Sequence, residues 1–324
     1  MSRRGLPRLA RWMIAAAAFA LLVAALALTL AFRRDMARAY ARITVGSELV
    51  ATQLGDVEYA LAGRGTPVLV VHGSGGGFDQ GDFLGRLVLG DEVRRITPSR
   101  FGYLRSTYRE GAGFEEQAQA YAALLDHLRV PRVAVLAFSH GGPSALLFAA
   151  RYPERVSSLT LLSAGVSSSD DAEQRRADLQ GAALMWIYRG DFRYWALTRG
   201  LRSWFLGLMG ADARVVAALD AGQREAVDAL LATMEPVQPR ARGAAFDHRA
   251  AMPDERIAAI RAPTLVVHAR DDSLQRHRNA EYAARLIPGA RLVSFERGGH
   301  LLAVVEQDAV RALVMQHLRS NGAR

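Results

Sequence analysis

The chain contains no cysteine and no lysine, so all 41 of its basic residues are arginine. Without cysteine it has no thiol nucleophile, no disulfide and no cysteine-based zinc site. Without lysine it forms no Schiff base and has no phosphate-binding loop of the kind that ends in lysine. The absence of cysteine is compatible with oxidising and reducing compartments alike, so it does not locate the protein.

The net charge of +9 does not indicate nucleic acid as a partner. Residues 1–42 hold eight arginines and one acid, Asp35, which gives +7. The remaining chain holds 33 arginines against 31 acids, which gives +2. A body whose positive and negative charges nearly cancel lacks the basic surface that DNA binding requires. The excess charge therefore belongs to the N-terminal segment.

An uncharged apolar run, residues 12–32, lies between arginines. As a helix it would be about 31 Å long, close to the hydrocarbon thickness of a bilayer. We therefore expect a single-pass membrane anchor. The alternative is a cleaved signal peptide, for which Ala25 and Ala27 offer a weak cleavage site. Four arginines on each side leave the orientation open, with a slight preference for a body outside the cytoplasm.

From residue 43 onward, short β-rich runs alternate with helical stretches, which predicts an α/β fold with a mostly parallel central sheet covered by helices on both faces. Residues 43–54 and 56–63 are expected to form an antiparallel pair, with its turn at Gly46 and Ser47. Further strands are expected within 67–73, 93–102, 132–142, 156–165, 262–272 and 290–300, and helices at 78–90, 114–129, 142–152, 276–286 and 302–319.

One interval, residues 166–261, has helical periodicity and no convincing strand. We expect it to be a helical cap inserted between two parts of one core, 43–165 and 262–324, with 1–42 as the membrane segment. The aromatic residues between 186 and 205 are expected to form mainly the core of the cap. The alternative is that some of them line an apolar pocket or contact the bilayer.

A serine, Ser139, follows an apolar run in the sequence Ala-Phe-Ser-His-Gly. This differs by one residue from the Gly-x-Ser-x-Gly elbow, in which a sharp strand-to-helix turn exposes the serine hydroxyl above the sheet. Ala137 replaces the first glycine and adds one methyl group where the backbone is crowded. Pro143 then lies near the start of the helix, where its missing N–H matters little.

A second glycine-rich segment, His72 to Gly77, follows the strand at 67–71. Its backbone N–H groups are candidates to bind a developing oxyanion together with the N–H of His140. We favour Ser74 as the donor from this loop, with Gly75 as the alternative. The segment does not match the dinucleotide-binding pattern Gly-x-Gly-x-x-Gly, because Phe78 occupies the position of its last glycine.

A hydroxyl nucleophile needs a base, and the base needs an acid to orient it. Acidic residues Asp271 and Asp272 end one predicted strand, and His300 follows the next, which gives the chain order Ser, Asp, His. Of the histidines at strand ends, His300 alone is not already assigned to a loop or to a strand interior.

With these motifs, the chain from about 43 to 320 resembles the α/β-hydrolase family of serine hydrolases with a helical cap. The resemblance implies Ser139 as nucleophile, His300 as base and Asp272, rather than Asp271, as the acid. It also implies backbone N–H groups of Ser74 and His140 as the oxyanion hole. Departures from the family pattern are Ala137 and Gln275, the latter where many members carry proline.

The resemblance implies a carboxylic ester hydrolase that forms an acyl-enzyme and needs no metal or organic cofactor. The anchor and the aromatic cap favour a small lipophilic ester as substrate. Carbon–carbon bond hydrolysis or perhydrolase activity on the same three residues remains an alternative. Epoxide and haloalkane hydrolysis are disfavoured, because the resemblance would then require aspartate at 139. From other functional classes, we retain a non-catalytic binding module and a membrane-tethered scaffold for a partner.

Overall fold

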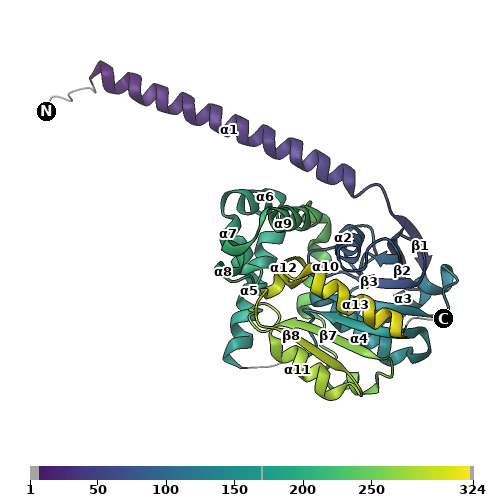
Figure 1. The fold of residues 1–324 in the computed structure, drawn as a ribbon. Coiled ribbons are helices and arrows are strands. Elements are labelled where there is room, and N and C mark those ends of the chain that lie inside the picture. Colours follow the sequence, from purple (N-terminus) through teal and green to yellow (C-terminus); the bar gives the residue numbers. More distant parts are fainter. Residues whose placement is uncertain (1–6, 169–170, 322–324) are drawn as a thin grey trace.

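The computed structural model describes residues 7–168 and 171–321. A long helix, α1 (Arg8–Arg42), precedes the body, and its N-terminal part extends away from it (Figure 1). By length and composition this helix is capable of crossing a membrane: its most apolar stretch has a mean hydropathy of 2.6, and none of that stretch is buried. Arg3 and Arg4 of the predicted basic flank lie outside the described residues.

The body is built on one eight-stranded sheet with the order β1-β2-β4-β3-β5-β6-β7-β8. Strand β2 pairs antiparallel with β1 and β4, and every other neighbouring pair is parallel. The mostly parallel sheet predicted from the sequence is therefore confirmed. The strands are β1 (Glu48–Thr52), β2 (Gly55–Ala62), β3 (Pro67–Val71), β4 (Arg94–Pro98), β5 (Val133–Phe138), β6 (Val156–Leu162), β7 (Thr264–Ala269) and β8 (Arg291–Phe295).

Helices cover both faces of the sheet, because successive side chains of a strand point to opposite sides. In β3, Val68 and Val70 pack in one core with α2 (Phe78–Leu89) and α13 (Gln307–Asn321). Leu69 and Val71 pack in the other core. That second core contains residues of α3 (Phe114–His127), α4 (Gly142–Arg151) and α11 (His277–Leu286).

Two local predictions were wrong. The β1–β2 turn lies at Gln53 and Leu54, since Thr52 pairs with Gly55, whereas Gly46 has φ +80° in the turn that follows α1. The reason is that α1 continues to Arg42 and β1 begins only at Glu48, so Gly46 lies in the connection between them. The helix expected at 302–319 is divided at Glu306 into α12 (Leu302–Val305) and α13.

Between β6 and β7 the described residues form helices with a third apolar core of their own. The aromatic residues there divide into two groups. Tyr194 and Phe205 are buried in this core, as expected, whereas Trp195 is buried against α1, and Trp186 and Trp204 are each 55% exposed. The helices are α5 (Ala172–Tyr188), α6 (Asp191–Gly200), α7 (Arg202–Leu208), α8 (Ala213–Ala218), α9 (Ala221–Thr233) and α10 (Ala241–Arg249).

The last turns of α1 pack against α6. Phe32 contacts Trp195 edge-to-face with 5.6 Å between ring centroids, and the indole Nε1 of Trp195 donates to Asp35 at 3.0 Å. The hydrogen bond from Trp195 lowers the pKa of Asp35, against the opposing effect of burial. Tyr40 donates to Asp191 at 2.9 Å. The C-terminal turns of α1 are therefore attached to the helical segment between β6 and β7.

Candidate active site

Ser139 lies directly after β5, at the tight turn into α4. Its φ of +49° is in the left-handed region, which is unfavourable for a residue with a Cβ. The neighbouring glycines make this turn possible. A Cβ on Gly141 would lie 2.5 Å from the carbonyl oxygen of Val71, and one on Gly142 would lie 2.6 Å from that of Gly165.

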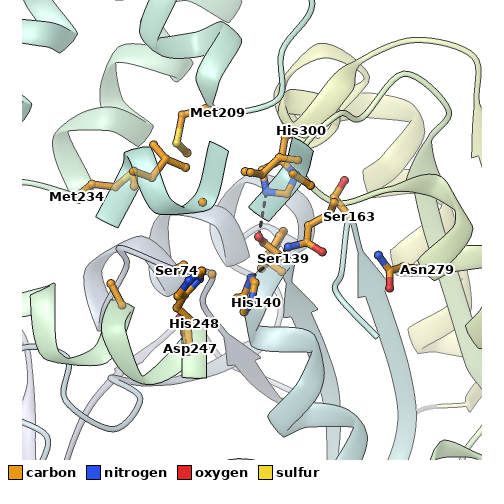
Figure 2. A pocket seen from close by; sticks show the side chains of 18 of the residues that line it. Ser74, Ser139, His140, Ser163, Met209, Met234, Asp247, His248, Asn279 and His300 are labelled. Carbon is orange, nitrogen blue, oxygen red and sulfur yellow. Dashed lines mark hydrogen bonds between the residues drawn. The ribbon is translucent and has the colours of Figure 1, made fainter. Parts of the chain in front are cut away.

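Three predicted site residues meet at this turn. The Nε2 atom of His300 lies 2.9 Å from Ser139 Oγ, and its Nδ1 atom lies 2.7 Å from Asp272 Oδ2. Figure 2 shows the contact between His300 and Ser139 within the pocket. Because a carboxylate only accepts, Nδ1 carries the ring hydrogen and leaves Nε2 to accept the hydroxyl hydrogen of Ser139.

Asp272 and Asp271 are adjacent in the chain and have different surroundings. Asp272 is buried, and its Oδ1 accepts from the backbone N–H groups of Leu274 and Gln275 at 3.0 and 2.9 Å. Asp271 accepts from the backbone of Gly298 and Gly299 at 3.3 and 2.7 Å. Asp272 thus contacts the imidazole of His300, whereas Asp271 binds the loop that precedes it.

The glycine-rich loop after β3 places Ser74 on the wall of the same pocket, together with His140. In that loop His72 is fully buried, with Nδ1 2.7 Å from the oxygen of Gly73 and Nε2 accepting from the backbone N–H of Arg100 at 3.0 Å. Burial, and then the charge of Arg100, lower the pKa of His72 well below its usual value. Burial likewise lowers the pKa of His140.

The sequence did not reveal the network that supports this loop. Tyr103 OH lies 3.2 Å from Ser74 Oγ and accepts from Gly75 N–H at 3.3 Å, and it donates to Asp247 on α10. Asp247 also forms a two-armed ion pair with Arg100, at 2.5 and 2.6 Å, with both side chains buried. Burial opposes the charge on Arg100, but Asp247 outweighs it and raises the pKa of the guanidinium. Tyr103 and Arg100 lie in the loop that follows β4, and no local signal in the sequence distinguishes Asp247.

The helical segment also contacts His300. The backbone N–H of His300 donates to the carbonyl of Gly210, between α7 and α8, at 3.1 Å. Gly210 has φ +85°, and a Cβ there would lie 3.1 Å from that of His300. Only a residue without a side chain allows the two segments to approach this closely.

Ser139 and His300 open onto a cavity of about 480 Å³ beneath these helices. Its wall includes many apolar side chains, among them Met209, Met234 and Tyr188, and among the described residues no arginine lines it. Within residues 7–168 and 171–321, no group of three or more histidine, aspartate or glutamate side chains is placed to hold a metal ion.

The family model described as alpha/beta hydrolase fold matches residues 66–307. An uncharacterized hydrolase, YcgS of Bacillus subtilis, is 30% identical over 76% of this chain and 89% of its own length. The 2-hydroxy-6-oxo-2,4-heptadienoate hydrolase of Pseudomonas putida is 30% identical over 83% of this chain and 93% of its own. The structure of an alpha/beta hydrolase fold protein from Nakamurella multipartita superimposes with a TM-score of 0.64 at 28% identity, covering 85% of this chain and all of that one.

Proposed function

Since this chain belongs to the alpha/beta hydrolase family and is a hydrolase, we propose that it cleaves carboxylic esters with Ser139 as nucleophile, His300 as base and Asp272 as the orienting acid. The continuous contact from Ser139 Oγ through the imidazole to Asp272 supports this proposal above all. A serine hydroxyl attacks a carbonyl only when a base accepts its hydrogen, and this arrangement provides that base.

In the proposed reaction, Ser139 Oγ attacks the ester carbonyl while His300 Nε2 takes the hydroxyl hydrogen. The tetrahedral oxyanion accepts from the backbone N–H groups of Ser74 and His140, each contributing about 3 kcal/mol to stabilisation of the transition state. His300 then returns the hydrogen to the departing alcohol, leaving an acyl group on Ser139. Water, activated by the same imidazole, releases the acid and restores the serine.

The wall of the cavity favours a neutral ester. The Pseudomonas putida relative is named for a dienoate, which is a carboxylate. A carboxylate bound away from water needs a cation or several donors. With no lysine in the chain and no arginine among the described lining residues, a lysine or arginine partner for a carboxylate is missing here, and apolar side chains predominate in the wall.

Carbon–carbon bond hydrolysis is the second candidate, because the relative at 30% identity is named as a hydrolase of 2-hydroxy-6-oxo-2,4-heptadienoate, a compound whose name contains no ester. A panel of p-nitrophenyl esters from acetate to palmitate, assayed beside 2-hydroxy-6-oxo-2,4-heptadienoate, separates the two. We expect ester turnover that increases beyond the shortest acyl chains. Turnover of the dienoate without turnover of any ester would replace the ester proposal, and a preference for acetate would contradict a lipophilic substrate.

A fluorophosphonate probe tests the nucleophile directly. The full chain in detergent is expected to be labelled, and Ser139→Ala is expected to abolish labelling. Ser157→Ala is the control, because Ser157 is a buried serine of β6 that does not line the cavity. If folded wild type is not labelled, or Ser139→Ala is labelled as well as wild type, the nucleophile is wrongly assigned and a binding module becomes the better interpretation.

We also propose that α1 anchors the protein in a membrane, with the body on the extracytoplasmic side. The length and hydropathy of the helix support the anchor. The test is fractionation after an alkaline carbonate wash, followed by determination of the N-terminal residue. Retention in the membrane pellet with an intact N-terminus is expected, and release of a chain that begins after Ala27 would identify a cleaved signal peptide.

A further inference from the structure

The cavity differs in chemistry on the two sides of Ser139. Figure 2 shows Met209 and Met234 on one side of the nucleophile, and Ser163 and Asn279 on the other. The two methionines belong to one apolar cluster with further lining residues, among them Leu206, Leu231 and Val304. Such a surface accommodates a hydrocarbon chain, and the flexible methionines adapt to its shape.

On the other side, Asn279 presents an unused donor. Its Oδ1 accepts from the backbone N–H groups of Val166 and Ser167 at 3.2 and 3.1 Å. Backbone N–H groups only donate, so these contacts fix which end of the amide is oxygen. Among the described residues, the Nδ2 group has no hydrogen-bond partner, although Asn279 is only 4% exposed and lines the cavity.

Ser163 is unusual in two respects. It follows β6 with φ +49°, the same left-handed backbone that Ser139 adopts after β5. Its side chain is 5% exposed, and its Oγ has no hydrogen-bond partner among the described residues. A buried hydroxyl without a hydrogen-bond partner is destabilising, and glycine would relieve the backbone strain. Two unfavourable features at one cavity residue indicate that its hydroxyl has a use there.

The position of this pair beside the nucleophile is fixed. Gly165 N–H, two residues after Ser163, donates to the carbonyl of Ser139 at 3.1 Å. Rotation about the single side-chain bond of Ser163 directs its hydroxyl without moving the backbone. Together the two side chains offer two neutral amide hydrogens and one group that both donates and accepts. These donors and this acceptor can form hydrogen bonds with hydroxyl groups of a ligand. They lack the positive charge that a carboxylate or phosphate would need.

We propose that Ser163 and Asn279 form a subsite for a hydroxyl-bearing alcohol, so that the preferred substrates are esters of a hydrocarbon acyl chain with a small neutral polyol. This inference rests on the proposed function and specifies its substrate class. The acyl chain occupies the methionine side of the cavity. The hydroxyl groups of the alcohol bond to the amide nitrogen of Asn279 and to Ser163 Oγ.

The test compares kcat/KM for 1-monooctanoylglycerol with that for ethyl octanoate, which has the same acyl group and no free hydroxyl. Wild type in detergent is expected to prefer the glycerol ester. Asn279→Asp keeps the oxygen that accepts from Val166 and Ser167 but removes the donor, and Ser163→Gly removes the hydroxyl while suiting the backbone. Each is expected to lower the preference roughly tenfold, the effect of one or two lost hydrogen bonds.

Ser157→Ala is the matched control, since it removes another buried hydroxyl without a partner among the described residues, within β6 and not lining the cavity. It is expected to leave the preference unchanged. If wild type does not prefer the glycerol ester, or if both subsite variants retain the wild-type ratio, the subsite is refuted. Absence of Ser139-dependent hydrolysis of either ester would instead refute the proposed function, so the two failures are distinguishable.

Discussion

Replacing Asp272 by asparagine is the sharpest test of the proposed roles of Ser139, His300 and Asp272. The two backbone N–H groups that bind Oδ1 only donate, so the amide oxygen must occupy that position and the NH₂ group must face His300 Nδ1. Two donors then oppose each other unless the imidazole carries its hydrogen on Nε2. In that tautomer Nε2 no longer accepts from Ser139. We expect kcat/KM to fall about ten-thousandfold, or about 5.4 kcal/mol of transition-state stabilisation.

The assay is hydrolysis of p-nitrophenyl octanoate by the full chain in detergent, with thermal unfolding to confirm that the variant is folded. Asp271→Asn is the matched control, because it changes the adjacent carboxylate, which accepts from the backbone N–H groups of Gly298 and Gly299 rather than from His300. It is expected to retain at least roughly a tenth of wild-type kcat/KM, since a neutral amide oxygen still accepts one of those bonds. Equal losses in the two variants, or nearly full activity of Asp272→Asn, would refute the reasoning.

Three further predictions concern stability. Asp247→Ala leaves Arg100 charged and buried without its partner, so the free energy of unfolding in urea should fall by about 3–5 kcal/mol; a change below about 1 kcal/mol would contradict it. Because the pKa of His72 is lowered in the folded state, its contribution to stability is complete above about pH 6.5 and is lost as the pH falls below that value. His72→Gln should therefore flatten the dependence of Tm on pH between 7 and 5, and an unchanged slope would refute this. Deleting residues 1–42 should destabilise the body by at least about 2 kcal/mol relative to deleting residues 1–30, because only the longer deletion removes the turns that pack on Trp195; equal Tm values would argue against that contact.

The attachment of α1 to α6 has a consequence for how the cavity is positioned. Because Asp35 and Tyr40 are hydrogen-bonded to α6, the helix and the segment above the cavity are held together. If α1 spans a bilayer as proposed, that segment stays close to the membrane surface. In the sequence, Asp35 is only a single acid among arginines. Nothing in the charge pattern indicates that it accepts a hydrogen bond from Trp195, 160 residues away.

Much of the fold was predictable because parallel strands buried on both faces have a strong signature. Runs such as Pro-Val-Leu-Val-Val and Val-Ala-Val-Leu-Ala-Phe are continuously apolar, and each is a central strand here. The position of the turn between the first two strands was harder to predict. The turn assigned to Gly46 and Ser47 failed because α1 continues to Arg42 and β1 begins only at Glu48, so that the chain reverses between Thr52 and Gly55.

The sequence by itself determined which chemistry is available and at which edge of the sheet it lies. Ser139, Asp272 and His300 each follow a strand, and the carboxyl ends of parallel strands share one edge. The resemblance implied Asp272 rather than Asp271 as the acid, whereas only the tertiary structure decided that Asp247 supports the glycine-rich loop through Tyr103 and that Ser163 and Asn279 share a wall of the cavity. The physical reason is that these contacts join residues more than about twenty positions apart, and their geometry depends on sheet twist and helix placement, which no local pattern encodes.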